Sequence, residues 1–433
     1  MSNFYKKIMR DKDFFDNYYK FKKNQITRII SKRKFNSFIL TTIPFFIAGC
    51  NATKNEKCYG GLGLIVGTVC ANSNSSNIIK LETVDTQNDY FLTPELDLIE
   101  FINSKNVFSD RYNLTSGDII KNADKFNIDL INVGSGFIGQ KIYDTNEINI
   151  SSKGNNVILT SDWYNNKKIT ISSIDNDLIL NDLQSTKLNS TIAPDGQYYP
   201  GTIYILENIN SPNSKIEFNF NPLALNGSST EVKFDIIDSN FSLIGDFYNP
   251  STVPPAEPPA STNPYNIPTD TNIESVILNV KGNVTLKDLN FLGLESLEIL
   301  GENSNKNFKI LSPLNTTLEK IYAQSTSTNL DLNFSNADIL IEKEVYLGSG
   351  DDIINVGNSL VDSLNSDFFS GGNGNDILLI NIQEEKNIAP TIEDFETIEI
   401  SVNANSNFDF SNISNLEKLK ISDSTSGINL QNL

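Results

Sequence analysis

The feature that most constrains the fold is a nine-residue Gly-Asp motif at residues 371–379, GGNGNDILL, which matches the pattern G-G-x-G-x-D-x-U-x at every specified position. Its glycines permit a tight turn with φ > 0 and leave backbone carbonyls accessible. Its Asp supplies the type of carboxylate that a hard cation such as Ca²⁺ prefers. The apolar residue after the Asp would point into the core of a coil. The motif therefore predicts a calcium-binding turn followed by a short strand.

A second copy of the motif occupies residues 347–355, LGSGDDIIN, with Leu347 in place of the first Gly. The two copies are 24 residues apart, which is longer than two uninterrupted nine-residue units, and residues 356–370 between them are degenerate. Two copies can form one or two calcium sites. The alternative interpretation is two ordinary Gly/Asp-rich turns of a β-protein that bind nothing.

Composition narrows the chemistry that the 433 residues can perform. The chain has no His, which removes the commonest general base, the Ser-His-Asp and Cys-His nucleophile systems, and the most usual metal ligand. Its three Cys all precede residue 71, so a Cys-rich zinc site in the body is excluded. A metal bound in the body would have oxygen ligands, which again favours calcium.

Charge is distributed unevenly along the chain. Residues 1–34 hold 11 Lys/Arg and 3 Asp/Glu, a balance of +8, and the remainder carries a balance of −27. An acidic body argues against nucleic acid as a partner. It suits a soluble surface protein in a calcium-containing medium, although an acidic balance could serve solubility alone.

The N-terminal region indicates export. Residues 1–34 form a basic, aromatic head, and the apolar run 35–49 is short for a membrane helix but the right length for a signal-peptide core. Its end, FIAGC, resembles a bacterial lipobox, in which Cys50 would be lipidated and become the mature N-terminus. The head is long for such a signal. An uncleaved anchor, an ordinary signal peptide and a buried apolar element are the alternatives.

If Cys50 is lipidated, Cys58 and Cys70 remain as a pair. In an oxidising compartment they could form a disulfide. The alternative is two free buried thiols.

We divide the chain by pattern into six parts. Residues 1–50 are the basic head and signal-like segment, and residues 51–92 are a linker. Residues 93–145 are expected to form a small helical subdomain, because Thr93 and Pro94 can open one helix and Thr115 a second. Residues 146–248 hold short runs rich in β-branched residues, spaced by Asn/Asp/Ser/Gly turns, which predict a β-rich domain. These runs are 148–150, 157–159, 169–171, 178–180, 203–205, 216–218 and 232–234.

Residues 249–268 contain seven prolines and cannot form a central strand or a helix interior. We interpret them as a linker or long surface loop and place a domain boundary there. Residues 269–433 then carry a weak repeat, apolar-Glu-x-apolar-x-apolar, which predicts a β-solenoid of stacked coils. It begins at residues 273, 294, 318, 395 and 416. The 77-residue gap holds the Gly-Asp motifs, which are therefore an insertion or specialised coils.

The order of Gly-Asp turn, degenerate stretch, full motif, and the DFETIEIS and NLEKLKIS units resembles RTX-type surface-layer proteins and related secreted RTX proteins of Gram-negative bacteria. The resemblance covers about residues 270–433 and implies a parallel β-roll or β-solenoid that binds Ca²⁺, folds outside the cell and assembles into a surface lattice or adhesive coat. The calcium residues that it implies are Gly348, Gly350, Asp352, Gly371, Gly372, Gly374 and Asp376. Such proteins usually carry a C-terminal secretion signal, which we do not find here, and usually lack a lipobox-like N-terminus.

The sequence thus predicts a mainly β protein at the cell surface, outer membrane or outside a Gram-negative cell. It would be a structural or adhesive protein, stabilised by Ca²⁺, held by the outer-membrane surface or a lipid anchor, and capable of homotypic assembly. The rival architecture is a leucine-rich repeat, because LESLEI and LEKLKI fit its strand pattern. The rival functions are a carbohydrate-binding or carbohydrate-cleaving surface lipoprotein and a pore-forming toxin. We predict no enzymatic activity, because nothing in the sequence places a carboxylate pair at working distance.

Overall fold

The fold was analysed in a computed structural model. It describes residues 82–84, 90–91, 98–101, 106–109, 118–131, 134–137, 141–160, 163–183, 201–222, 224–225, 231–248, 272–302, 305–362, 364–422 and 424–433. Within these ranges no residue is helical, and every strand pairing is parallel. No helix in them is long and apolar enough to cross a membrane.

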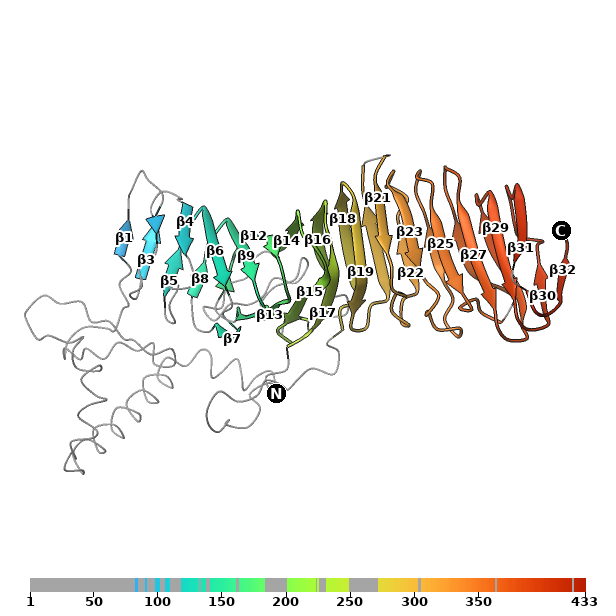
Figure 1. The fold of residues 1–433 in the computed structure, drawn as a ribbon, viewed down its shortest axis with the longest axis horizontal. Coiled ribbons are helices and arrows are strands. Elements are labelled where there is room, and N and C mark those ends of the chain that lie inside the picture. Colours follow the sequence, from blue (N-terminus) through green and yellow to red (C-terminus); the bar gives the residue numbers. More distant parts are fainter. Residues whose placement is uncertain are drawn as a thin grey trace, which may run out of the picture. The chain divides into compact units, whose positions relative to one another are not determined.

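The strands form three parallel sheets (Figure 1). The five-stranded sheet contains β1 (Glu82–Val84), β3 (Leu98–Phe101), β5 (Ile119–Lys121), β8 (Lys141–Tyr143) and β11 (Trp163–Tyr164). The 12-stranded sheet contains β7 (Gly134–Phe137), β10 (Asn156–Leu159), β13 (Leu178–Leu183), β15 (Asn210–Phe220), β17 (Asn240–Phe247), β19 (Val284–Phe291), β21 (Asn307–Ile310), β23 (Asn329–Asn333), β25 (Ile353–Gly357), β27 (Ile377–Ile382), β29 (Thr397–Val402) and β31 (Lys418–Ser422).

The 15-stranded sheet contains β2 (Tyr90–Phe91), β4 (Asn106–Ser109), β6 (Lys125–Ile131), β9 (Glu147–Lys153), β12 (Lys168–Ile174), β14 (Ile203–Glu207), β16 (Glu231–Ile237), β18 (Ser275–Lys281), β20 (Ser296–Leu300), β22 (Lys320–Tyr322), β24 (Glu344–Tyr346), β26 (Leu364–Ser370), β28 (Asn387–Glu393), β30 (Ser406–Asp409) and β32 (Ile428–Gln431). From β12 onward, successive strands alternate between the 12-stranded and 15-stranded sheets. Each coil therefore lays one strand on each sheet, which defines a parallel β-solenoid.

The solenoid interior is built from continuous columns of apolar side chains. Alternation of partly exposed and buried residues along the strands turns every second side chain inward. The parallel register then stacks inward residues of one coil on those of the next. One buried column in the 15-stranded sheet consists of Phe126, Ile148, Ile169, Tyr204, Phe234, Leu278 and Ile299. A second consists of Val232, Val276, Leu297, Ile321, Val345, Phe369 and Ile392.

Aromatic rings fill the interior where the two long sheets face each other near β14–β19. The ring of Phe234 lies 5.0 Å from that of Phe218 and 5.6 Å from that of Phe291. Gly245 makes room for this cluster, because a Cβ placed on it would lie 2.1 Å from the Phe291 ring. Ring pairs of this kind add about 1 kcal/mol each beyond the area they bury.

Asn and Asp residues hold the corners of the coils. Asn122, Asn165 and Asn208 have positive φ, as do Asp144 and Asp238. Their short polar side chains tolerate the left-handed conformation and bond to the corresponding corner one coil away. For example, Asn165 Nδ2 donates to Asp144 Oδ1 at 2.6 Å. The abundance of Asn that accompanies the turn signals thus has a structural use.

The strand predictions for residues 146–248 are confirmed, since all seven β-branched runs lie in strands β9, β10 and β12–β16. The helices expected within residues 93–145 do not form where the structure describes those residues. Leu98–Phe101 is β3 and Ile119–Lys121 is β5, and both pair with neighbours in the five-stranded sheet. Pairing with other coils outweighs the local capping signals at Thr93 and Thr115.

The domain boundary expected at residues 249–268 does not interrupt the solenoid. Strand β16 pairs with β18, and β17 pairs with β19, so both long sheets continue from one side of this segment to the other. Residues 249–268 themselves lie outside the described residues, as do 1–50 and most of 51–92. Residues 146–248 and 269–433 therefore belong to one solenoid, with the Pro-rich segment between two consecutive coils.

The Glu-containing repeat is correct in its strands but wrong in treating them as one series. Its first three copies lead into β18, β20 and β22 of the 15-stranded sheet, whereas its last two lead into β29 and β31 of the 12-stranded sheet. The 77-residue gap is filled by regular coils with strands β23–β28. The Gly-Asp motifs are thus specialised coils and not an insertion. A leucine-rich repeat is also disfavoured, because each coil here contributes two strands.

Candidate functional site: the stacked Gly-Asp turns

The two Gly-Asp motifs lie on consecutive coils at the same corner of the solenoid. Strands β25 and β27, which follow the motifs, pair with Ile353 opposite Ile377 and Ile354 opposite Leu378. The 24-residue spacing of the motifs is therefore one complete coil. This explains why the spacing exceeds two nine-residue units: the residues between the motifs cross the other sheet as β26 and return.

The glycines allow the backbones of neighbouring coils to approach closely at this corner. A Cβ placed on Gly372 would lie 2.0 Å from the Gly348 carbonyl oxygen, and one on Gly374 would lie 2.0 Å from that of Gly350. Gly348 approaches the Thr326 carbonyl oxygen in the same way, one coil earlier. Gly372 and Gly374 also have φ of +89° and +148°. No side chain larger than hydrogen fits without displacing the adjacent backbone.

The motif carboxylates point inward and bond to the preceding coil. Asp352 Oδ1 accepts a hydrogen bond from the Leu330 backbone N–H at 2.7 Å, and Asp376 Oδ1 accepts one from the Asp352 N–H at 2.8 Å. The series continues at Glu396, whose Oε2 accepts from the Asp376 N–H at 2.7 Å. These acidic side chains form a ladder that ties three coil junctions together.

The second oxygen of each motif carboxylate is left without a partner. Asp352 and Asp376 are fully buried, and the Oδ2 atom of each makes no hydrogen bond. Burial raises the pKa of Asp352 to about 6, with backbone hydrogen bonds opposing the rise. Burial raises the pKa of Asp376 to about 8, and the nearby charges of Asp352, Glu396 and Asp351 add to the rise. A buried unpaired carboxylate oxygen is costly, and either a proton or a cation would relieve that cost.

The donors fit a calcium ion in chemical type and in burial. Asp352 and Asp376 would supply carboxylate oxygens from adjacent coils, and Ca²⁺ prefers six to eight oxygen ligands. Among the described residues no group of three or more Asp, Glu, Cys or His side chains gathers as a metal site. Backbone carbonyls would have to supply the other protein ligands, and the Gly348 carbonyl already accepts from Asn373 N–H at 2.9 Å.

The structure brings together all seven motif residues predicted from the sequence. Gly348, Gly350 and Asp352 lie on one coil, and Gly371, Gly372, Gly374 and Asp376 lie on the next. The sequence did not identify Glu396, which continues the ladder one coil later. The lipidation site predicted at Cys50 and the disulfide between Cys58 and Cys70 lie outside the described residues.

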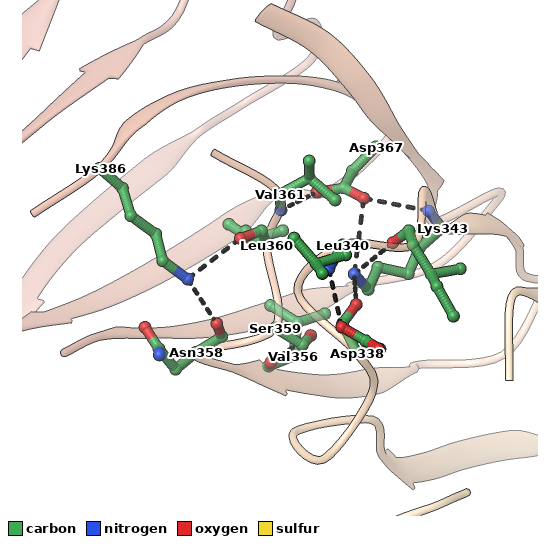
Figure 2. A network of polar contacts seen from close by, with 11 residues as sticks. Asp338, Leu340, Lys343, Val356, Asn358, Ser359, Leu360, Val361, Asp367 and Lys386 are labelled. Atoms are coloured by element: carbon green, nitrogen blue, oxygen red, sulfur yellow. Dashed lines mark hydrogen bonds and ion pairs between the residues drawn. The ribbon is translucent and has the colours of Figure 1, made fainter. Parts of the chain in front are cut away.

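A second buried polar cluster lies in the same coils, around Lys343, Asp367 and Lys386 (Figure 2). Lys343 Nζ donates to the backbone carbonyls of Asp338 at 2.6 Å and Ile341 at 2.5 Å, and lies 4.0 Å from Asp367 Oδ1. Lys386 Nζ donates to the Asn358 carbonyl at 2.8 Å and the Leu360 carbonyl at 3.2 Å.

Asp367 links this cluster to the backbone of two further segments. Its Oδ1 accepts from the Lys343 backbone N–H at 3.0 Å and its Oδ2 from the Val361 N–H at 2.8 Å. Burial lowers the pKa of Lys343 and raises that of Asp367, and each charge opposes the shift of the other. Because the charged ends are enclosed and bonded to loop carbonyls and amides, the cluster acts as an internal support for the loops and not as a reactive site.

The sequence carried a signal for this second cluster. Lys343 precedes Val345 by two residues, Asp367 precedes Phe369 by two, and Lys386 precedes Ile388 by two. Strand periodicity therefore places all three charged residues in the inward phase. A charged residue in that phase is either an error in the register or a buried partner in a network.

Comparison with protein-family models, curated proteins and solved structures finds no match to this chain. The class that its geometry defines is a parallel β-solenoid with a Gly-Asp turn stack.

Proposed function

We propose that this protein is an exported structural or adhesive protein of the cell surface whose solenoid is stabilised by Ca²⁺ at the Gly-Asp turn stack. The observation that carries the proposal is the pair of buried, unbonded Oδ2 atoms on Asp352 and Asp376, on consecutive coils beneath glycine turns. A cation bound to both would neutralise the clustered carboxylates and join two coils.

Calcium binding of this kind would couple folding to export. Binding to the folded chain adds a stabilisation of RT ln(1 + [L]/Kd), about 2.7 kcal/mol at a hundredfold excess over Kd. That stabilisation would be small inside a cell, where free calcium is scarce, and large in an external medium. The RTX-type surface-layer resemblance of residues 270–433 supports the same setting.

The location and anchor in this proposal rest on sequence alone. The lipobox-like segment ending at Cys50 supports a lipid anchor on the outer membrane of a Gram-negative bacterium. The balance of −27 beyond residue 34 supports a partner other than nucleic acid.

Homotypic assembly is the proposed route to a surface layer. Strands β31 and β32 are edge strands of the two long sheets, and each pairs with only one described strand. The side chain of Ile421 on this edge is 45% exposed. Edge strands with apolar side chains favour pairing with a further strand, here from a second copy.

The calcium proposal is tested by thermal unfolding of the full chain during titration with Ca²⁺ and with a chelator. We expect a saturable rise in Tm, and we expect Asp376→Asn to lose it because the variant removes one anionic ligand. Asp331→Asn is the matched control, since this Asp forms an exposed ion pair with Lys309 at 2.9 Å. Equal stability of the wild-type chain in calcium and chelator would show that the motifs are plain turns.

A further inference from the structure

A stripe of aromatic and acidic side chains crosses the outer face of the 15-stranded sheet. We call it the aromatic–acidic stripe, and its members project outward from strands β20, β22, β24, β26 and β28. It consists of Glu298, Tyr322, Glu344, Tyr346, Phe368 and Glu393. The register places Glu298, Tyr322 and Tyr346 in one column and Glu344 beside Phe368 in the next.

The rings of the stripe are in mutual contact and their hydroxyls share one acid. The rings of Tyr322 and Tyr346 stack with centroids 5.9 Å apart, and the Tyr346 ring lies 4.9 Å from that of Phe368. Glu344 accepts hydrogen bonds from both hydroxyls, at 3.3 Å from Tyr322 and 3.0 Å from Tyr346. All four side chains remain partly exposed. The stripe is therefore ordered before any ligand arrives, which lowers the entropic cost of binding.

The charge of the stripe favours a cationic ligand. Glu298, Glu344 and Glu393 provide three carboxylates, and the adjacent cation is Lys320, 3.8 Å from Glu344. The pKa of Tyr346 is raised, first by its hydrogen bond to Glu344 and then by burial and by the charges of Glu344 and Glu393. Aromatic rings also attract cations.

The position of the stripe distinguishes a carbohydrate from a peptide. Strands β22, β24 and β26 each pair with neighbours on both sides, so their backbone groups are already bonded. A peptide that binds by adding a strand needs a free sheet edge, which this part of the sheet does not offer. A polysaccharide brings its own hydroxyl groups and needs only side chains. Its repeating units can also follow side chains that recur at the strand spacing of about 4.8 Å.

We infer that the aromatic–acidic stripe binds a polysaccharide whose sugars carry free amino groups, lying across successive coils. The amines would bind the carboxylates, and sugar faces and hydroxyls would contact the rings and hydroxyls of the tyrosines. This inference names a ligand class for the adhesive role proposed above and rests on that role for its biological setting. It does not require calcium at the Gly-Asp turn stack.

The test is isothermal titration calorimetry of the full chain with glucosamine oligosaccharides, in calcium and in chelator. We expect saturable binding that weakens about tenfold with Tyr346→Ala and about tenfold with Glu344→Gln, each equivalent to the loss of one good contact. Tyr143→Ala, in β8 of the five-stranded sheet, is the matched control and should leave the affinity unchanged. Thermal unfolding of every variant shows that it is folded.

Two comparison probes decide the chemistry. The N-acetylated oligosaccharide should bind at least about tenfold more weakly, because acetylation removes the positive charge. Oligolysine of equal charge should also bind weakly and should be insensitive to Tyr346→Ala. Equal binding of oligolysine, equal binding of the acetylated sugar, or no binding of the amino sugar would each overturn the inference. Failure here with a calcium-dependent rise in Tm would leave the calcium proposal standing, and the reverse result would leave the stripe standing.

Discussion

The glycines of the Gly-Asp motifs matter because backbone meets backbone at one corner of the solenoid. A methyl group on Gly372 would sit 2.0 Å from the Gly348 carbonyl oxygen. That is far inside van der Waals contact, and the atom it meets belongs to the rigid backbone. At this scale the motif is a packing requirement whether or not a cation is bound.

Gly372→Ala should therefore destabilise the folded chain by about 2–3 kcal/mol, from steric overlap and from its positive φ together. Gly427→Ala is the matched control, because the nearest atom to its Cβ would be Asn405 Oδ1 at an ordinary 3.6 Å. We expect that variant to stay within about 0.5 kcal/mol of the parent. Urea unfolding of both variants measures the difference, and equal midpoints would contradict the close approach of the coils.

The buried carboxylates predict an unusual pH dependence. The pKa of Asp376 rises from 3.8 to about 8 on folding, and that of Asp352 rises to about 6. The folded chain thus binds more protons than the unfolded chain between about pH 4 and pH 8. Without calcium, the stability contributed by these groups is fully present below about pH 4 and is lost as the pH rises toward 8.

This dependence is measured by Tm from pH 4 to 9 in chelator. Asp376→Asn should flatten the part of the curve between pH 6 and 8, because the amide does not titrate. Calcium should reduce the loss in the wild-type chain, because it binds the ionised form. General repulsion within an acidic chain also grows with pH, so the relevant quantity is the difference between wild type and variant. Parallel curves for the two proteins would contradict a buried titration at Asp376.

Among the elements, β24 and β26 depend on a buried ion pair for the loops that join them to the other sheet. Lys343 is 1% exposed and neutralises Asp367 while it bonds two loop carbonyls. Removing one partner would leave the other charge buried and uncompensated.

Lys343→Met should cost about 3–5 kcal/mol of unfolding free energy. Lys309→Met is the control, because its ion pair with Asp331 is exposed and worth at most about 1 kcal/mol. A double-mutant cycle with Asp367→Asn, followed by chemical denaturation, should give a coupling of about 1 kcal/mol or more. Additive effects would show that the two residues act independently.

Local sequence patterns predicted strands better than they predicted the partners of those strands. The β-branched runs such as Ile169–Ile171 alternate in burial and are strands, because their pattern matches their environment. Leu98–Phe101 carries capping signals upstream and still pairs as β3, because parallel partners lie tens of residues away in sequence. A local window contains no record of those partners.

The candidate site was predictable in composition but not in arrangement. Asp352 and Asp376 could be chosen from the motif because cation chemistry fixes both the residue type and its spacing from Gly. Their stacking on consecutive coils depends on β26 crossing the opposite sheet, and the degenerate residues 356–370 gave no sign of that crossing. Glu396 has no motif of its own, and only the coil register places it in the ladder.

For the molecule as a whole, the described solenoid is a series of junctions of one kind. Each coil contacts the coil before it and the coil after it, through parallel strands, inward columns and corner side chains. Stability should therefore depend on neighbouring junctions more than on contacts across long distances. The Pro-rich segment between β17 and β18 illustrates this, since a long excursion in the chain leaves the pairing of the adjacent coils intact.

The register across the Gly-Asp coils also defines a unit of inheritance. Asp331 pairs with Ile353, and Ile353 pairs with Ile377, so loss of the 24 residues from 353 to 376 would place Ile377 where Ile353 now lies. A gene encoding such a chain can gain or lose one coil by duplication or deletion while the remaining coils keep their pairing pattern. The length of the protein can then change in discrete steps, independently of the chemistry on its outer face.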